Sequence, residues 1–132
     1  FYAFMNDVTL ETIAFVPHPT IEMAGASPDR LVGDDGLLEI KAPAIHTHIE
    51  TLLTGVIEPD YQKQMVWQLA CTGRQWVDYC SYEPRLPENL RMFTKRFERD
   101  EPAIKAMQAE VEKFNADVED TIRQLQRLVR GD

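Results

Sequence analysis

Residues 27–43, SPDRLVGDDGLLEIKAP, constrain this chain most, because they predict two short strands joined by a tight turn. Pro43 ends the second strand, since proline has no N–H to donate to a ladder. The loop at residues 34–36 suits a type I turn followed by a left-handed glycine. This loop predicts the pairs Gly33 with Leu37, Leu31 with Glu39, and Asp29 with Lys41.

The predicted register gathers charged side chains on one face of the hairpin. Residues two apart in a strand point the same way, so Asp29, Leu31, Glu39 and Lys41 share a face. A two-residue loop would instead separate Asp29 from the other charges. Carboxylates are hard ligands that suit Mg²⁺ or Mn²⁺, and a neighbouring lysine can hold the attacking water or neutralise charge on phosphorus. The face therefore predicts a metal-dependent centre for phosphodiester hydrolysis, and the alternative is an exposed ribbon of solvated charges.

The rest of the chain predicts alternating strands and helices. Strands are expected at residues 9–16, 21–32, 36–42, 75–84 and 90–99, and helices at 1–5, 44–54 and 59–72. A final helix of about 28 residues carries an apolar stripe at a three/four spacing. The stripe consists of Ile104, Met107, Val111, Phe114, Val118, Ile122, Leu125 and Val129. This order predicts one α/β domain, a mixed central sheet flanked by helices with a long C-terminal helix.

Composition fits one globular domain, with 132 residues of which 44% are hydrophobic. The net charge of −8 by itself argues against a nucleic-acid binder, but it is unevenly spread. Residues 1–60 carry −8, residues 61–99 carry +3 and residues 100–132 carry −3. This asymmetry is compatible with metal ions on one wall and a phosphate backbone on the other, and equally with solvated faces.

Two function classes are not supported by the sequence. No apolar run predicts a membrane span, and no signal peptide precedes the first strand, so we expect no membrane partner. Cys71 and Cys80 are the only cysteines and form no CxxC pair, which argues against a disulfide scaffold or a cysteine zinc site. A reducing cytoplasm fits this cysteine usage best.

The hairpin motif resembles a known superfamily. Asp29 preceded by proline, Glu39 ten residues later and Lys41 in an ExK are similar to the PD-(D/E)xK nucleases. More narrowly, the chain resembles the bacteriophage lambda exonuclease family, the YqaJ-like viral recombinases. The matching stretches are SPDRLVGDDGLLEIKAP, YQKQMVWQLACTGRQWVDYCSYEPR and FERDEPAIKAM.

The resemblance implies a restriction-endonuclease-like core and an activity. Family members degrade linear double-stranded DNA processively from the 5′ end, release mononucleotides and need Mg²⁺, with Mn²⁺ as a possible substitute. They form a trimeric ring around DNA and work with a phage single-strand annealing protein in homologous recombination. The implied location is the cytoplasm of the bacterial host cell.

The resemblance also implies roles for six residues. Asp29 and Glu39 match metal ligands, with the backbone carbonyl of Ile40 completing the metal site, and Lys41 matches the catalytic lysine. Ser27 and Gln64 match positions near the phosphate of the substrate. Independently of the family, Gln64 shares a helix face with Tyr61 and Gln68.

The chain departs from the family in two places. Arg30 follows Asp29 where the family usually has glycine. The family also has an upstream helix that supplies a Glu for a second metal, and an Arg that binds the 5′ phosphate. Neither motif occurs in residues 1–24, where Glu11 and Glu22 fall on predicted strands. We therefore expect residues 1–132 to be a single nuclease domain that lacks its N-terminal helical part.

Two alternatives remain open at this level. One is a PD-(D/E)xK nuclease of other polarity, such as a restriction-like enzyme; an iron–sulfur form is disfavoured because the chain has no cysteine cluster. The other is a non-catalytic truncated module that keeps the fold for DNA binding or assembly.

Other side chains that could carry function are assigned structural roles. His46 and His48 would point about 200° apart on a helix, which argues against a shared metal. His18, between two prolines, is expected to be solvated. Trp67 and Trp76 are expected in the core.

Overall fold

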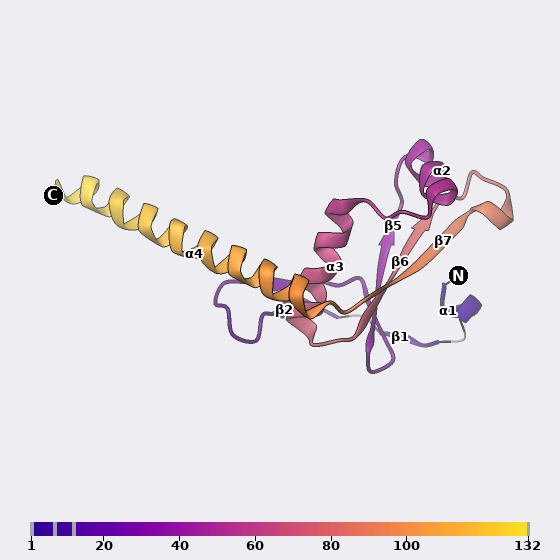
Figure 1. Cartoon of the computed structure of the whole chain (residues 1–132), viewed down its shortest axis with the longest axis horizontal. Coiled ribbons are helices and arrows are strands. Elements are labelled where there is room, and N and C mark those ends of the chain that lie inside the picture. The colour runs from indigo at the N-terminus through magenta and orange to yellow at the C-terminus, as the bar shows by residue number, and fades with distance from the viewer. Residues whose placement is uncertain (1, 7, 12, 132) are drawn as a thin grey trace.

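A computed structural model describes residues 2–6, 8–11 and 13–131, and it shows the mixed α/β architecture that the sequence predicts (Figure 1). The main sheet has the order β1-β4-β5-β6-β7, in which β5 and β6 are parallel and the other neighbours antiparallel. A second sheet pairs β2 with β3. The strands are β1 (Leu10–Glu11), β2 (Val16–Pro17), β3 (Gly25–Ala26), β4 (Arg30–Val32), β5 (Gly36–Lys41), β6 (Trp76–Tyr82) and β7 (Met92–Glu98).

The described residues also form the helices α1 (Tyr2–Asn6), α2 (Ile45–Thr54), α3 (Pro59–Thr72) and α4 (Glu101–Arg130). A short 3₁₀ turn, Glu88–Leu90, precedes β7. Pro59 occupies the first turn of α3, where its missing N–H costs nothing. Gly55 and Gly73 end α2 and α3 in the left-handed conformation, with φ of 67° and 70°. The predicted helices 44–54 and 59–72 are therefore confirmed.

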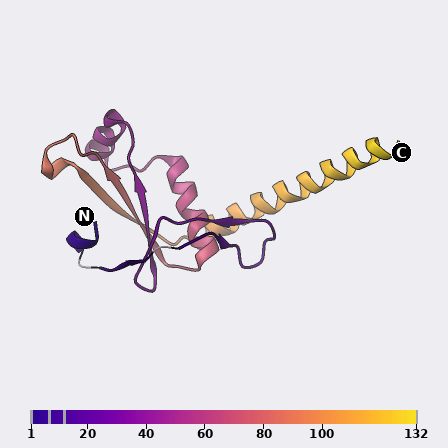
Figure 2. The same ribbon diagram turned by 180° about the vertical axis from the view of Figure 1, so that it is seen from behind.

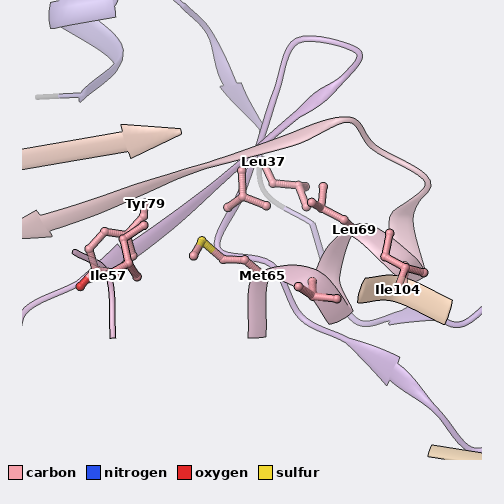
Figure 3. Close-up of a cluster of buried hydrophobic side chains, with 9 residues drawn as sticks. Leu37, Ile57, Met65, Leu69, Tyr79 and Ile104 are labelled. Carbon is pink, nitrogen blue, oxygen red and sulfur yellow. The ribbon is translucent and has the colours of Figure 1, made fainter. Parts of the chain in front are cut away.

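The core lies between one face of the sheet and the helix α3 (Figure 3). Leu37 of β5 and Tyr79 of β6 pack there against Met65 and Leu69 of α3 and Ile104 at the start of α4. A smaller cluster covers the other face, formed by Tyr2, Val32, Leu38 and Cys80. The indole rings of the two tryptophans pack against these clusters, Trp67 on the first and Trp76 on the second, as predicted.

Two strand predictions in the first 30 residues are wrong. Residues 9–16 do not form one strand: β1 pairs with β4, while β2 belongs to the second sheet, and residue 12 lies outside the described residues. Residues 21–23 form a bend and turn, in which Met23 has a φ of 57°. The cause is His18, whose Nδ1 accepts the N–H groups of Thr20 and Ile21 at 3.1 and 3.0 Å. Those donors are then unavailable to a ladder.

The hairpin loop begins and ends one residue earlier than predicted, at residues 33–35 instead of 34–36. The observed pairs are Arg30 with Leu38, Leu31 with Leu37 and Val32 with Gly36, so the loop is Gly33–Asp35. Gly33 is the left-handed residue, with a φ of 55°. Gly36 serves packing instead, because a Cβ there would lie 2.2 Å from the Trp76 ring. The shift moves each pairing by two residues, which preserves the face shared by the charged side chains.

The last helix leaves the body as a long rod (Figures 1 and 2). Ile104 is buried in the core, and Met107 and Val111 are half-buried. The rest of the predicted stripe is exposed, from Phe114 to Val129. In the described part of the chain, no helix combines the length and hydropathy needed to cross a bilayer.

Candidate active site

The α3-facing side of β5 carries the charged cluster that the sequence predicts. Leu37, Glu39 and Lys41 alternate with residues of the opposite face, so Leu37 enters the core and the other two follow it toward the end of the strand. Glu39 is only 5% exposed, which is unusual for a carboxylate. Its oxygens are both engaged: Oε1 lies 3.0 Å from Lys41 Nζ, and Oε2 accepts a hydrogen bond from Gln68 Nε2 at 2.8 Å.

The ammonium group of Lys41 is held by groups from two elements. Besides Glu39 on its own strand, it donates to Gln64 Oε1 of α3 at 3.1 Å. It also lies 4.8 Å from the centroid of the Tyr61 ring, within cation–π range. The side chain keeps 23% of its surface exposed, so a substrate can still reach it. Gln64, predicted from the family pattern, is thus brought to Lys41.

Asp29 joins the cluster where the β4 ladder stops. The last β4–β5 pair is Arg30 with Leu38, and the N–H of Ile40 is bonded instead by Asp29 Oδ2 at 2.7 Å. A strand residue directs its N–H and C=O to the same side. The carbonyl of Ile40 therefore faces the same side as the carboxylate of Asp29, which is the arrangement expected of a shared ligand site.

Ser27 and Arg30 flank Asp29 without entering the hydrogen-bonded group. Ser27 is exposed, in the segment between β3 and β4. The exposed guanidinium of Arg30 donates to the main-chain oxygen of Asp29 at 2.6 Å. Ser27 therefore remains a prediction from the family pattern.

The oxygen donors fit a hard divalent cation. Two carboxylates and one main-chain carbonyl are the ligand types that Mg²⁺ and Mn²⁺ accept, with waters or substrate oxygens filling the remaining positions. Among the described residues no group of three or more His, Cys, Asp or Glu is arranged to hold a metal.

Two contributors were not assigned a role by the sequence, Gln68 and Tyr61. Both contact the charged pair directly, Gln68 through Glu39 and Tyr61 through Lys41. The available signal was the spacing of 61, 64 and 68 on one helix face. That spacing shows that these residues share one face of the helix. Only the packing of α3 on β5 shows that this face contacts Glu39 and Lys41.

The histidines stand outside this site. His48 is fully buried, with Nδ1 2.6 Å from Ser81 Oγ and Nε2 2.8 Å from the Leu90 oxygen. His46 is exposed, so the two rings do diverge as predicted. The prediction of a solvated His18 is wrong: the ring is 8% exposed and stacks on Trp67 at 5.3 Å.

The basic residues of the middle segment mainly stabilise the chain itself. Arg96 pairs with Asp78 at 2.8 Å and lies 3.6 Å from the centroid of the Trp76 ring. Arg99 donates to the carbonyls of Leu69 and Arg74. Their positive charge is thus partly committed to the fold, which favours the structural interpretation of the charge asymmetry.

A second ion pair beyond the end of β6 gives a pH-dependent prediction. Glu83 is 3% exposed and accepts hydrogen bonds from Arg85 Nε at 2.7 Å and Nη2 at 2.8 Å. These bonds lower the pKa of Glu83 from 4.5 to about 2. Its stabilising effect is therefore full above pH 4.5 and is lost as the pH falls toward 2.

We expect Arg85→Gln to reduce the loss of unfolding free energy over this pH range, because Glu83 then titrates nearer its ordinary pKa. Urea unfolding at a series of pH values measures the slope of the unfolding free energy against pH. Arg123→Gln, which removes an exposed partner of Asp120 at 3.7 Å, is the matched control and should leave the slope unchanged. Parallel curves of unfolding free energy against pH for Arg85→Gln and the parent would show that Arg85 does not lower the pKa of Glu83.

Comparisons with known proteins identify solved structures that share this fold. Two solved structures are similar over 96% of this chain at 48% sequence identity and a TM-score of 0.94. They are the alkaline exonuclease LHK-Exo from Laribacter hongkongensis and LHK-Exo in complex with dAMP. The chain spans 65% of the length of each, and no curated protein matches it.

The family comparison covers the N-terminal part of the chain and the hairpin. Residues 1–75 match the model of the YqaJ-like viral recombinase domain. This range contains Asp29, Glu39, Lys41 and the α3 residues that hold them. The match extends over more than half of the chain, and the chain therefore belongs to the family of YqaJ-like viral recombinase domains.

Proposed function

We propose that the protein is a Mg²⁺-dependent exonuclease that degrades linear double-stranded DNA from the 5′ end in phage homologous recombination. The observation that carries the proposal is Lys41 held between Glu39 and Gln64 at the end of a buried strand, where Asp29 accepts a hydrogen bond from the N–H of the neighbouring Ile40. Support comes from the similarity to an alkaline exonuclease, including its complex with dAMP, a mononucleotide of the kind that exonucleolytic cleavage releases.

Asp29, Glu39 and the Ile40 carbonyl are the proposed ligands of Mg²⁺, with Mn²⁺ as a substitute. When bound, the ion would polarise the scissile phosphate and make water a better nucleophile. Burial of Glu39 keeps its charge in a poorly solvated environment, where a divalent cation is attracted more strongly than at the surface. The residues would thus select a cation and leave part of its coordination to the substrate.

Lys41 is proposed to act on the reacting groups. Its ammonium is a donor with three hydrogens, of which Glu39 and Gln64 account for two contacts. The remaining donor capacity can hold the attacking water or a phosphate oxygen as negative charge develops. Gln64 is exposed and orients Lys41, and exposed Ser27 is proposed to contact the phosphate of the substrate.

Assembly and partners are part of the proposal. Double-stranded DNA ends are the proposed substrate, a trimeric ring the proposed assembly, and a phage single-strand annealing protein the proposed partner, all in the host cytoplasm. The support is membership of the YqaJ-like viral recombinase family.

A non-catalytic module for DNA binding or assembly is the second candidate. It is favoured by the small number of acidic groups at the site, since the described residues contain no third carboxylate beside Asp29 and Glu39. A single cation would then have to serve both the attacking and the leaving oxygen.

Digestion of a linear duplex distinguishes these candidates. One duplex carries a label at its 5′ phosphates and another at its 3′ ends, and each is incubated with Mg²⁺ or with EDTA beside a covalently closed circle. We expect early release of the 5′ label as mononucleotide with Mg²⁺ only, and an intact circle. Earlier release of the 3′ label would indicate the other polarity, and binding of the duplex without release would indicate the module.

A further inference from the structure

Gln68 is a buried amide whose two ends have different surroundings. It lies on α3 and is 6% exposed. Its Nε2 donates to Glu39 Oε2 at 2.8 Å. Its Oε1 is the one buried side-chain nitrogen or oxygen, among the residues that the structure describes, with no hydrogen-bond partner. An amide so placed has lost its solvation on one side without replacement.

We propose that Gln68 is a positioning residue for the cation: it fixes the Glu39 carboxylate through Nε2, and its Oε1 accepts a hydrogen bond from a water on the ion. The proposal rests on the metal site of the proposed function. It concerns an α3 residue to which neither the hairpin motif nor the comparisons assign a role.

The hydrogen bond to Glu39 has a geometric consequence. A glutamate side chain has three rotatable bonds. An ion pair with Lys41 alone would leave the Glu39 carboxylate free to rotate, so a second partner is needed to fix its orientation. Gln68 holds Oε2 on the α3 side while Oε1 is directed to Lys41. Partners that orient a ligating carboxylate in this way pre-organise the site and raise metal affinity.

The unpaired Oε1 of Gln68 is free to accept a hydrogen bond from a water on the ion. A primary amide can donate to a carboxylate through its nitrogen and accept from a water through its oxygen at the same time. Mg²⁺ and Mn²⁺ keep several waters when they bind few protein ligands, and such waters are strong donors. The orphaned acceptor beside Glu39 is thus satisfied when a hydrated ion is present.

Titration with Mn²⁺ alone, followed by the electron paramagnetic resonance signal of the free ion, tests this inference without any catalytic readout. Gln68→Met keeps the shape of the side chain and removes both polar ends. Gln68→Asn keeps the amide but withdraws it from Glu39 by one methylene. Gln62→Met is the matched control, because Gln62 lies on the same helix and donates to the main-chain oxygen of Ile57 at 2.7 Å. Circular dichroism establishes that each variant is folded.

We expect both Gln68 variants to bind Mn²⁺ about 10-fold or more weakly, as changes behind metal ligands usually do, and Gln62→Met to stay within about twofold of the parent. If one Gln68 variant is unfolded, the other decides. Affinity equal to the parent in the folded Gln68 variants would overturn the inference and leave the proposed metal site standing. Equal binding by the parent and by Glu39→Gln would overturn both.

Discussion

Replacement of Glu39 by glutamine is expected to lower Mg²⁺-dependent nucleotide release by more than about 100-fold. Mutation of residues that merely orient a metal ligand costs up to about 100-fold, and loss of a ligand should cost more. The variant keeps the shape of the side chain and its contact with Gln68, but it removes the charge that attracts the cation. Glu39 is only 5% exposed, so its carboxylate lies where a divalent cation would be attracted more strongly than at the surface. Release of acid-soluble nucleotide from linear duplex at several Mg²⁺ concentrations measures the loss.

The fold of Glu39→Gln is expected to survive, because the Lys41 side chain is 23% exposed and can be hydrated when its partner is neutral. Asp34→Asn is the matched control: it removes the same charge from the exposed turn of the same hairpin. We expect this control to retain parental activity. A Glu39→Gln variant that keeps more than about a tenth of parental activity would show that this carboxylate is not a ligand of the cation.

Lys41→Met is expected to separate catalysis from metal binding. The apolar stem is kept, and the donor beside the developing charge is lost, so kcat should fall by about 10²- to 10³-fold. Mn²⁺ affinity should be equal or higher, because the ammonium that lies 3.0 Å from Glu39 Oε1 no longer competes with the cation. Single-turnover kinetics and a Mn²⁺ titration measure the two effects separately.

Lys105→Met, an exposed lysine on α4, controls for loss of one positive charge. Its activity and metal affinity should match the parent. Weaker Mn²⁺ binding by Lys41→Met would indicate that the lysine supports the fold of the site, and unchanged kcat would remove it from the reaction.

The hairpin shows what the sequence could and could not predict about the site. The predicted alternation of side chains along the second strand was correct, because Glu39 and Lys41 point to the same face and form an ion pair. Asp29 lies just outside the ladder and accepts a hydrogen bond from the N–H of Ile40. The turn was wrong because two glycines were available and serve different purposes: Gly33 adopts the left-handed conformation, while Gly36 makes room for Trp76. The Trp76 ring, 40 residues beyond Gly36 in the sequence, decides which glycine adopts the left-handed conformation and which one is needed for packing. The local sequence of the turn does not contain that information.

Long-range contacts also explain the errors near the N-terminus. The alternation in residues 9–16 is compatible with one strand, but the chain pairs its two ends with different sheets. His18 was assigned to solvent because prolines flank it, yet Trp67 stacks on its ring and Gln108 of α4 lies 2.8 Å from its Nε2. Helix periodicity, by contrast, is a local property, and α2, α3 and α4 were predicted to within a few residues.

Anomalous diffraction from crystals of the protein soaked in Mn²⁺ locates the cation that the proposed function requires. We expect a single strong peak coordinated by the carboxylates of Asp29 and Glu39 and the carbonyl of Ile40, with a coordinated water hydrogen-bonded to Gln68 Oε1. The same soak of Glu39→Gln should show no peak there. Mn²⁺ bound away from these residues, with Lys41 still paired to Glu39, would contradict the proposed metal site.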